Sequence, residues 1–244
     1  MRGKRNARLS GGWVALVALG LGVLVAMGVC GPAAPAWADE KSDAQQLVDK
    51  ARVTFEAFVG DKKMGPALKA LLQKAKGVLI YPQVLRGAFV FGVSGGSGTF
   101  VAHDAQTKKW GGPAFYTIGE TSFGLQAGGD ASEVVLVALT ERGITSLLST
   151  SAKLGADVGV AVGPVGAGAE AATANLSADI VSYARAKGLY AGMSVEGAVV
   201  ATRSSLNKAY YGQEVSPTDI LIRRTVSNPQ AAGLIEALTK AGGK

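Results

Sequence analysis

Six short apolar runs between residues 77 and 139 constrain the fold more than any other feature of this chain. Each run is rich in Val, Ile, Phe or Tyr and is bounded by Gly, Pro or polar residues, which is the pattern of β-strands. Neighbouring runs lie only roughly ten residues apart, which leaves no room for the crossover helix that usually joins parallel strands. We therefore expect a largely antiparallel sheet. The runs are GVLIYP, GAFVFGV, GTFVAH, AFYTIGE, SFGLQAG and EVVLVAL.

Helical patterns flank these strands. Ser42 and Gln45 match a capping box, and apolar residues follow at helical spacing as far as Val59. A second helix is expected over residues 66–75. Near the other end, Ser216-Pro217 and Asn228-Pro229 each place a capping residue before a proline, as at helix starts. The predicted fold class is α+β: a curved, largely antiparallel, glycine-rich sheet flanked by N- and C-terminal helices, with barrel-like closure as one form of the curvature.

The first 38 residues have the features of a secretory signal peptide. An apolar stretch runs from Gly11 to Val29, and Ala36 and Ala38 supply the small residues that signal peptidase requires before its cut. We predict cleavage after Ala38 and a single domain over residues 39–244. The domain is expected to be exported, either to the periplasm or into the medium, where it could associate peripherally with a membrane. The basic residues that precede the apolar stretch are Arg2, Lys4, Arg5 and Arg8.

Two other fates of this segment stay open. The apolar stretch approaches membrane-spanning length, so it would form an anchor if it were not cut. Cys30 would be acylated in a lipoprotein, although Val29 is bulkier than the Gly, Ala or Ser expected before such a cysteine.

Cleavage would change the charge and remove the only thiol. The whole chain has 25 basic and 18 acidic residues, and without the basic start it keeps 21 and 18. This small excess gives little support to nucleic-acid binding. No cysteine would remain for disulfides, thiol catalysis or metal binding.

The run GVAVGPVGAGAEAAT, residues 159–173, resembles a phosphate-binding loop at first sight. Its glycines do not have the G-x-G-x-x-G order of a dinucleotide fingerprint, and no Gly-Lys-Ser/Thr follows them. The surrounding pattern is expected to be antiparallel, whereas the fingerprint needs a βαβ unit. We therefore interpret Gly159, Gly163, Gly166 and Gly168 as structural glycines and predict no cofactor.

Catalytic and metal-binding patterns are weak. His103 is the only histidine, and with Asp104 it is expected to form a solvated polar pair at a strand end. GVSGG matches G-x-S-x-G around Ser94, but the residues after it predict a strand, whereas a nucleophile elbow leads into a helix. The carboxylates are scattered singly, without metal-ligand spacing. We predict no catalytic residue, no metal and no enzyme.

Six ordered blocks over residues 75–212 are similar to the SYLF domain family, a lipid-binding family with eukaryotic members at actin patches and membranes. The resemblance implies that the Gly-Pro-Val-Gly segment belongs to the family scaffold. The blocks are AKGVLIYP, GAFVFGVSGGSGTFVAHD, KWGGPAFYTIGETSFGLQAGGDASEVVLVAL, GADVGVAVGPVGAGAEAAT, SYARAKGLYAGMSVEGAVVATR and AYYG.

The resemblance also implies binding to phosphoinositides or other anionic lipids, in some members through an amphipathic N-terminal helix, and actin binding in some eukaryotic members. This sequence departs from the eukaryotic pattern because it shows no Src-homology or zinc-finger domain and carries an export signal. An exported domain would meet a different acidic lipid and no cytosolic actin.

A basic segment is the candidate lipid-binding site. No acidic residue occurs between Lys62 and His103, which leaves a run of cations for an anionic phospholipid surface. The alternative for this segment is an ordinary solvated helix face. The alternative for the whole domain is a structural or protein-interaction module of the cell envelope; protein partners, lipid identity and oligomeric state are not predicted. The candidate residues are Lys62, Lys63, Lys69, Lys74, Lys76 and Arg86.

The processing prediction can be tested directly. Chain isolated from cells should begin at Asp39, because Ala36-Trp37-Ala38 is the best peptidase site after the apolar stretch. Intact mass and N-terminal sequencing measure this start. An acylated start at Cys30, or an uncut apolar stretch, would contradict the prediction.

Overall fold

The computed structural model describes residues 36–88, 91–123, 128–173, 177–186, 189–190 and 195–243. The basic start, the apolar stretch and Cys30 lie outside the described residues. Among the helices of the described part, none is long and apolar enough to cross a bilayer.

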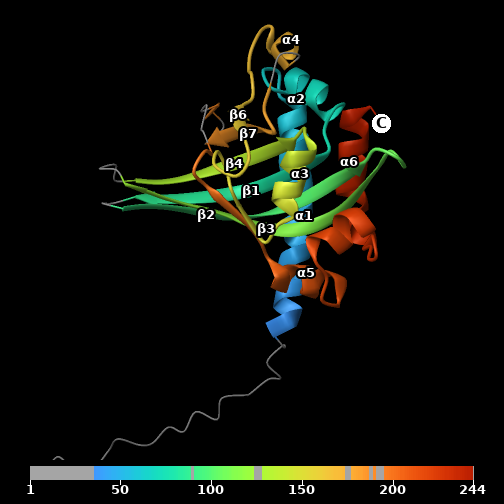
Figure 1. Ribbon diagram of the computed structural model, residues 1–244. Helices are drawn as coiled ribbons and strands as arrows, with labels where there is room; N and C mark the ends of the chain where they lie inside the picture. Colours follow the sequence, from blue (N-terminus) through green and yellow to red (C-terminus); the bar gives the residue numbers. More distant parts are fainter. Residues whose placement is uncertain are drawn as a thin grey trace, which may run out of the picture. The chain divides into compact units, whose positions relative to one another are not determined.

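One curled sheet organises the domain (Figure 1). Its described strands follow the order β5-β9-β3-β2-β1-β4-β7-β6, and β8 pairs with β7. Every described pair is antiparallel except β6–β7, so the predicted curved, largely antiparallel α+β fold is confirmed as a half-barrel. The strands are β1 (Gly77–Ala88), β2 (Phe91–Asp104), β3 (Lys109–Phe123), β4 (Gly128–Ala138), β5 (Ser151–Lys153), β6 (Val160–Val162), β7 (Ile180–Ala186), β8 (Leu189–Tyr190) and β9 (Val199–Thr202).

The described residues of the six predicted runs belong to four long strands, β1 to β4; residues 89–90 of GAFVFGV and 124–127 of SFGLQAG lie outside the described residues. GVLIYP does not end at Pro82 but continues to Ala88, because the pairing register of β1 with both neighbours shifts around Pro82. A bulge accommodates a residue that cannot donate a ladder hydrogen bond. The glycines of GVSGGSG, which indicated a turn, lie inside β2 opposite this bulge. A Cβ at Gly96 would collide with the carbonyl oxygen of Gln83, so glycine permits the close approach of the two strands.

Alternate residues of each central strand enter two different cores. Val78 and Ile80 of β1 belong to one cluster, and Leu79 and Tyr81 belong to the other. This division follows from the two-residue period of a strand, with both faces of the sheet covered. Figure 1 shows α1 crossing behind the sheet and α3 lying in front of it.

The helices cover these two faces. The first core, which contains Val78 and Ile80, is completed by α1, α2, α5 and α6. The second core, which contains Leu79 and Tyr81, is completed by α3 and the π-helix η2. Phe55 and Phe58 of α1 are fully buried, as expected for core residues. The helices are α1 (Ala36–Gly60), α2 (Gly65–Leu72), α3 (Glu141–Leu148), α4 (Ala169–Ala172), α5 (Ser204–Tyr211), η2 (Asp219–Arg223), the 3-10 turn η3 (Pro229–Ala231) and α6 (Ala232–Gly242).

The predicted helix starts are right at one end of the chain and wrong at the other. Asn228 caps η3 through its side chain, which accepts the Gln230 N–H, and Pro229 is the first helical residue. The Ser42 capping box is wrong, because α1 begins at Ala36 and Ser42 accepts a hydrogen bond from Gln46 inside the helix. The preceding Ala, Glu and Lys residues favour helix and extend it beyond the local capping signal.

Candidate functional site

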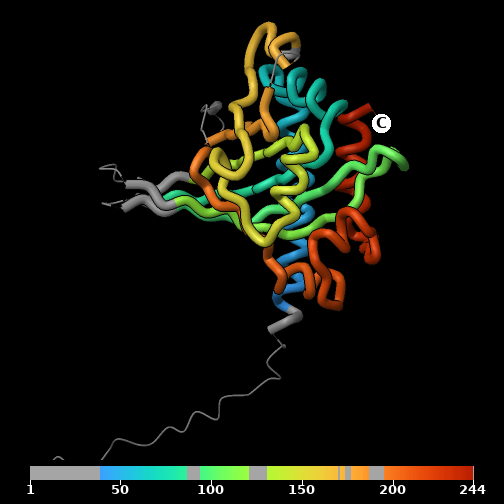
Figure 2. Tube along the Cα trace, viewed as in Figure 1, coloured from blue at the N-terminus to red at the C-terminus, as the bar shows by residue number. Residues whose placement is uncertain are grey.

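The glycine run connects β6 to the four-residue helix α4 and rests against the start of α2. The Gly166 N–H donates to the Lys63 carbonyl oxygen at 3.0 Å, and the Gly163 N–H donates to Ser182 O at 2.8 Å. Figure 2 shows this part of the chain (yellow to orange) beside α2 (cyan). These N–H groups serve the fold, so they are not available to a phosphate.

The start of the run is fixed by Asp179. Its carboxylate accepts the Thr140 hydroxyl at 2.6 Å and the Gly159 N–H at 3.1 Å. The Thr140 hydroxyl, with the Gly159 N–H and Arg142, lowers the pKa of Asp179 below its usual value. The charged carboxylate thus ties together the end of β4, the glycine run and the start of β7.

The expectation of antiparallel surroundings is wrong at this one place. β6 pairs with β7 in parallel, and the glycine run with α4 forms the connection between them. A strand–loop–helix–strand context therefore does exist, but α4 has only four residues. The glycine order and the internally bonded N–H groups still distinguish the run from a dinucleotide fingerprint.

Two glycines of the run are required for different reasons. A Cβ on Gly163 would overlap the ring of Tyr183, which is buried beneath it. Burial raises the pKa of this tyrosine, so its hydroxyl stays neutral. Gly166 has open space around it but a φ of 92°, which other residues rarely adopt.

Two separate predictions, the basic segment and the glycine run, meet in space. Lys62 and Lys63 line a cleft of about 850 Å³ whose other wall is the glycine run and α4. Both lysines are exposed, as are Val162 and Val165 of the run, at 44% and 50%. We call Lys62, Lys63, Val162 and Val165 the loop tip. Nothing in the sequence distinguishes these exposed valines from core residues, so sequence reasoning missed them.

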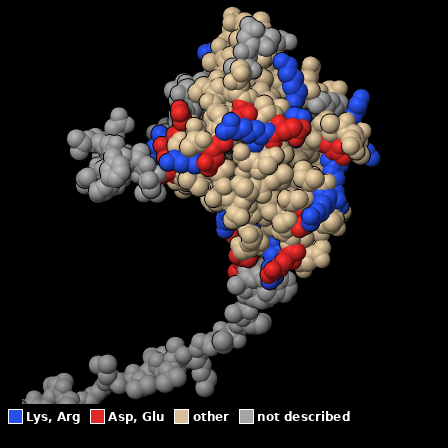
Figure 3. All heavy atoms as spheres, in the orientation of Figure 1, with Lys and Arg blue, Asp and Glu red and all other residues tan. Residues whose placement is uncertain are grey.

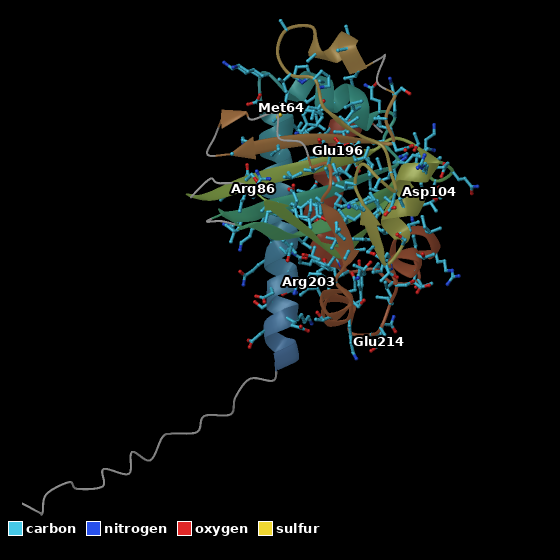
Figure 4. The ribbon with its side chains drawn as sticks, turned by 60° about the vertical axis from the view of Figure 1, so that its left-hand side comes forward. Met64, Arg86, Asp104, Glu196, Arg203 and Glu214 are labelled. Atoms are coloured by element: carbon cyan, nitrogen blue, oxygen red, sulfur yellow. The ribbon has the colours of Figure 1, made fainter. Side chains whose placement is uncertain are left out.

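The other predicted cations lie elsewhere. Lys69 is exposed on α2, whereas Lys74 and Lys76 line a second pocket, and Lys76 pairs with Glu141 at 2.6 Å. Arg86 lies on β1 and pairs with Glu120 at 3.5 Å. In Figure 4, Met64 marks the start of α2 beside the loop tip, Asp104 marks the second pocket, and Arg86 lies apart from both. The six cations therefore do not form one compact group.

Opposite charges are mixed on the face drawn in Figure 3. Basic and acidic side chains lie next to one another in a band at the level of α3. None of the ion pairs among the described residues involves Lys62, Lys63 or Lys69. Lys74 likewise takes part in none of these ion pairs, but it lines the second pocket, so Lys62, Lys63 and Lys69 are the predicted cations that an external anion could meet at the loop tip and the adjoining face of α2.

The hydrolase pattern does not assemble. Ser94 and His103 lie on the same strand, β2, nine residues apart, which corresponds to about 30 Å. Asp104 accepts hydrogen bonds from the Gln106 N–H at 2.8 Å and the Thr107 hydroxyl at 2.8 Å. The Thr107 hydroxyl is the main cause of a lowered pKa at Asp104. Asp104 is thus a turn-forming carboxylate, and the described residues hold no cluster of three or more potential metal ligands.

Comparison with known proteins identifies the family. The sequence profile of the family described as "Ysc84: Las17-binding protein actin regulator" matches residues 119–241, half of the chain. The chain belongs to this family. This confirms the resemblance to SYLF domains that the ordered sequence blocks indicated.

Eukaryotic relatives extend the similarity toward the N-terminus. Human "SH3 domain-containing YSC84-like protein 1" is 33% identical over 181 residues, which are 73% of this chain and 52% of that protein. Yeast "Protein YSC84" is 30% identical over 217 residues, 87% of this chain and 45% of that protein. Yeast "LAS seventeen-binding protein 3" is 28% identical over 216 residues, with 87% and 46% covered. The chain spans about half the length of these Ysc84 relatives.

The Ysc84 profile covers the glycine run but not the basic segment. It begins at Gly119, near the end of β3, and ends in α6. Lys62 and Lys63 therefore lie outside the matched residues, and Val162 and Val165 lie within them. The family description is that of a binding and regulatory domain, and no catalytic activity is part of it.

Replacement of Gly163 tests the architectural role of the run. Gly163→Ala should lower the melting temperature, because its Cβ overlaps the Tyr183 ring. In a Tyr183→Leu background the same change should lower the free energy of unfolding by less, because the ring is gone. The loss of stability in the double variant should therefore differ from the sum of the two single losses by roughly 0.5–3 kcal/mol. Thermal unfolding of the four proteins measures this coupling.

Gly60→Ala is a matched control, since a Cβ there meets nothing within 4 Å and no left-handed backbone is involved. Additive effects of Gly163→Ala and Tyr183→Leu would contradict the proposed contact. A rise in melting temperature on addition of nucleotides would revive the phosphate-loop interpretation.

Proposed function

We propose that this chain is a non-catalytic domain that binds an anionic phospholipid surface through the loop tip, assisted by Lys69. The observation that carries the proposal is the position of two exposed lysines, without an ion pair among the described residues, beside a glycine run that also exposes Val162 and Val165. Lys62 and Lys63 line one cleft with Gly166, whose N–H donates to the Lys63 carbonyl oxygen, and Val165 directly precedes Gly166 in the chain. Basic residues are attracted to an anionic leaflet, and the transfer of small apolar side chains from water into its interface is favourable.

The charge at this place favours an external anion. The nearby carboxylate of Asp61 accepts the backbone N–H groups of Lys63 and Met64, at 2.7 and 3.0 Å. It is thereby held toward the start of α2. The ammonium groups of Lys62 and Lys63 remain without an ion pair among the described residues.

The expected free energy is sufficient for reversible binding. A lysine near an anionic leaflet contributes about 1 kcal/mol, so three lysines would contribute ~3 kcal/mol, more than a hundredfold in partitioning. Partial burial of the two valines would add about 1 kcal/mol each. The electrostatic part is screened over roughly 8–10 Å at ordinary salt.

The first helix is a weaker candidate for the membrane contact. Its large apolar residues Phe55 and Phe58 are fully buried against the sheet. To insert the apolar face of α1 into a bilayer, the helix would have to separate from the sheet and disrupt the core that contains Phe55 and Phe58. Surface binding by a preformed tip avoids this cost.

Export forms the second part of the proposal. The basic start, the apolar stretch and the Ala36-x-Ala38 site together support a secreted or periplasmic domain that begins at Asp39. Asp39 and Glu40 would then lie at the start of α1, where acidic residues interact favourably with the helix dipole. In this location the ligand would be an acidic phospholipid other than a cytosolic phosphoinositide.

The family description favours a second candidate function, a protein-binding module. The profile carries the words "Las17-binding protein actin regulator", and one yeast relative is named "LAS seventeen-binding protein 3". A partner protein of this class would replace the lipid as the ligand of the domain. Actin co-sedimentation of the purified chain separates this candidate from the first.

Charge reversal at the loop tip tests the lipid proposal. The chain, in the form isolated from cells, should sediment with phosphatidylglycerol vesicles, bind phosphatidylcholine vesicles weakly, and dissociate as salt increases. Lys62→Glu, Lys63→Glu and Lys69→Glu together should abolish most of this binding, because three attractive charges become repulsive. Circular dichroism of the triple variant checks that the fold is kept.

A matched triple variant controls for net charge. Lys109, Lys153 and Lys240 are exposed and take part in none of the described ion pairs, so their change to Glu alters the total charge equally. This variant should keep most of the binding. Equal loss in both triple variants would contradict a local site, and failure of the unchanged protein to bind would favour the protein-binding module.

A further inference from the structure

A second pocket, of about 600 Å³, lies where four separate segments meet. Lys74 and Lys76 reach it from the connection between α2 and β1, and Lys108 from the β2–β3 turn. Arg224, directly after η2, completes the cationic lining. This volume is within the range of pockets that hold small organic ligands.

Part of the pocket is apolar. Ala75, Ala102, Ile144 and Leu221 contribute to its lining, and each is buried. His103 also lines it, and its ring packs against that of Trp110 with 5.0 Å between centroids. The pocket thus combines an apolar surface with charged groups, which suits a ligand that has both.

The charges in the pocket do not cancel. Glu141 pairs with Lys76 at 2.6 Å, and Asp104 pairs with Arg224 at 3.6 Å. Lys74 and Lys108 take part in none of the ion pairs of the described residues. Within the described part of the chain, two positive charges at this cavity therefore remain without an ion-pair partner.

Backbone strain coincides with this charge. Lys108 and Arg224, with φ of 54° and 55°, are the two non-glycine residues with left-handed backbone in the described part of the chain. Both line this pocket. The adjacent η2 is a π-helix, a rare form that is frequent at functional sites. Strained residues cluster at binding sites because other interactions determine their conformation.

The two strained residues have different roles. The Arg224 guanidinium donates to Lys109 O at 2.8 Å and to the Thr107 hydroxyl at 3.3 Å, so it holds the β2–β3 turn in place. Lys108 is exposed on that turn, and among the described residues no hydrogen bond of its side chain is found. A glycine would adopt the same backbone without strain. Among the described residues, the side chain of Lys108 thus has no hydrogen-bond or ion-pair partner that accounts for its place there.

We propose that this pocket binds the phosphate group of an organic phosphomonoester, with Lys74 and Lys108 as its direct ligands. A phosphomonoester has a charge close to −2 at neutral pH, which matches the two uncompensated lysines. The organic part lies over the apolar lining. Arg224 is a positioning residue that fixes the turn carrying Lys108. The phosphomonoester comes from a soluble metabolite or from the headgroup of a lipid, and this site is separate from the loop tip.

The single histidine provides a specific reporter. His103 is the only histidine of the 244 residues and lines the pocket, so its ring proton signals report occupancy in NMR spectra of protein without a histidine tag. At fixed pH, phenyl phosphate should shift these signals saturably. Phenyl sulfate, which has the same shape but one charge, should bind more weakly, by about tenfold if one charge-assisted contact is lost.

Substitution of the two lysines tests the assignment. Lys74→Ala with Lys108→Gly should weaken phenyl phosphate binding by at least about tenfold. Lys108→Gly alone should weaken binding without lowering the melting temperature, because it relieves the left-handed strain. Lys109→Ala is the matched control, since Lys109 is exposed on the same hairpin and does not line the pocket. It should bind as the unchanged protein does.

Vesicles distinguish the two sources of phosphate. If the source is a lipid, the unchanged protein should prefer phosphatidic acid, a monoester, over phosphatidylglycerol, a diester, and the double variant should lose that preference. If the source is soluble, the double variant should lose phenyl phosphate binding alone. The loop-tip triple variant should retain its phenyl phosphate response, so failure of one proposal is separable from failure of the other.

Two results would overturn the inference. One is the absence of any His103 shift with phenyl phosphate at millimolar concentration. The other is an equal shift and affinity in the double variant. A fall in the melting temperature of Lys108→Gly with unchanged affinity would show that Lys108 has a structural role instead.

Discussion

The packing of α1 across one face of the sheet is the interaction on which the rest of the structure depends. Val48, Phe55 and Phe58 are buried there among residues of β1 to β4, and α1 also contacts α2, α5 and α6. The side chain of Gln230, at the start of the C-terminal helices, donates to Gln45 O at 3.1 Å and to Asp49 at 2.9 Å. One helix thus joins both ends of the domain, and burial of its apolar face leaves other surfaces for ligands.

The position of α1 determines where the candidate surfaces lie. The turn after α1 carries Lys62 and Lys63, and the hydrogen bond from Gly166 to Lys63 fixes the glycine run beside it. Tyr183 supports the run at Gly163 from the sheet side. The second pocket begins where α2 leads into β1. Both candidate surfaces therefore use the short connections on either side of α2, which belong to the segment outside the matched family profile.

Sequence reasoning predicted the fold class, the antiparallel central strands and the capped start of the last helices, because these follow from local periodicity and turn chemistry. It divided β1 and β2 wrongly, because Pro82 and the glycines around Gly96 look like turns until the two strands are paired. It proposed Lys62 and Lys63 as candidate lipid-binding residues but did not include Val162 and Val165, because the exposure of an apolar side chain is a property of the assembled fold. Lys108 and Arg224 were missed because left-handed backbone leaves no sign in a non-glycine residue.

A fluorescent label at the loop tip tests the central claim most directly. The chain has one cysteine, Cys30, which precedes the predicted cleavage site, so Val165→Cys offers a single thiol for an environment-sensitive dye. Val199→Cys is the control, because Val199 is 42% exposed on β9, similar to Val165 at 50%. With anionic vesicles, we expect a blue shift and brighter emission at position 165 and no change at position 199. Vesicle binding that leaves the dye at position 165 unchanged, or that shifts the dye at position 199 instead, would contradict the account.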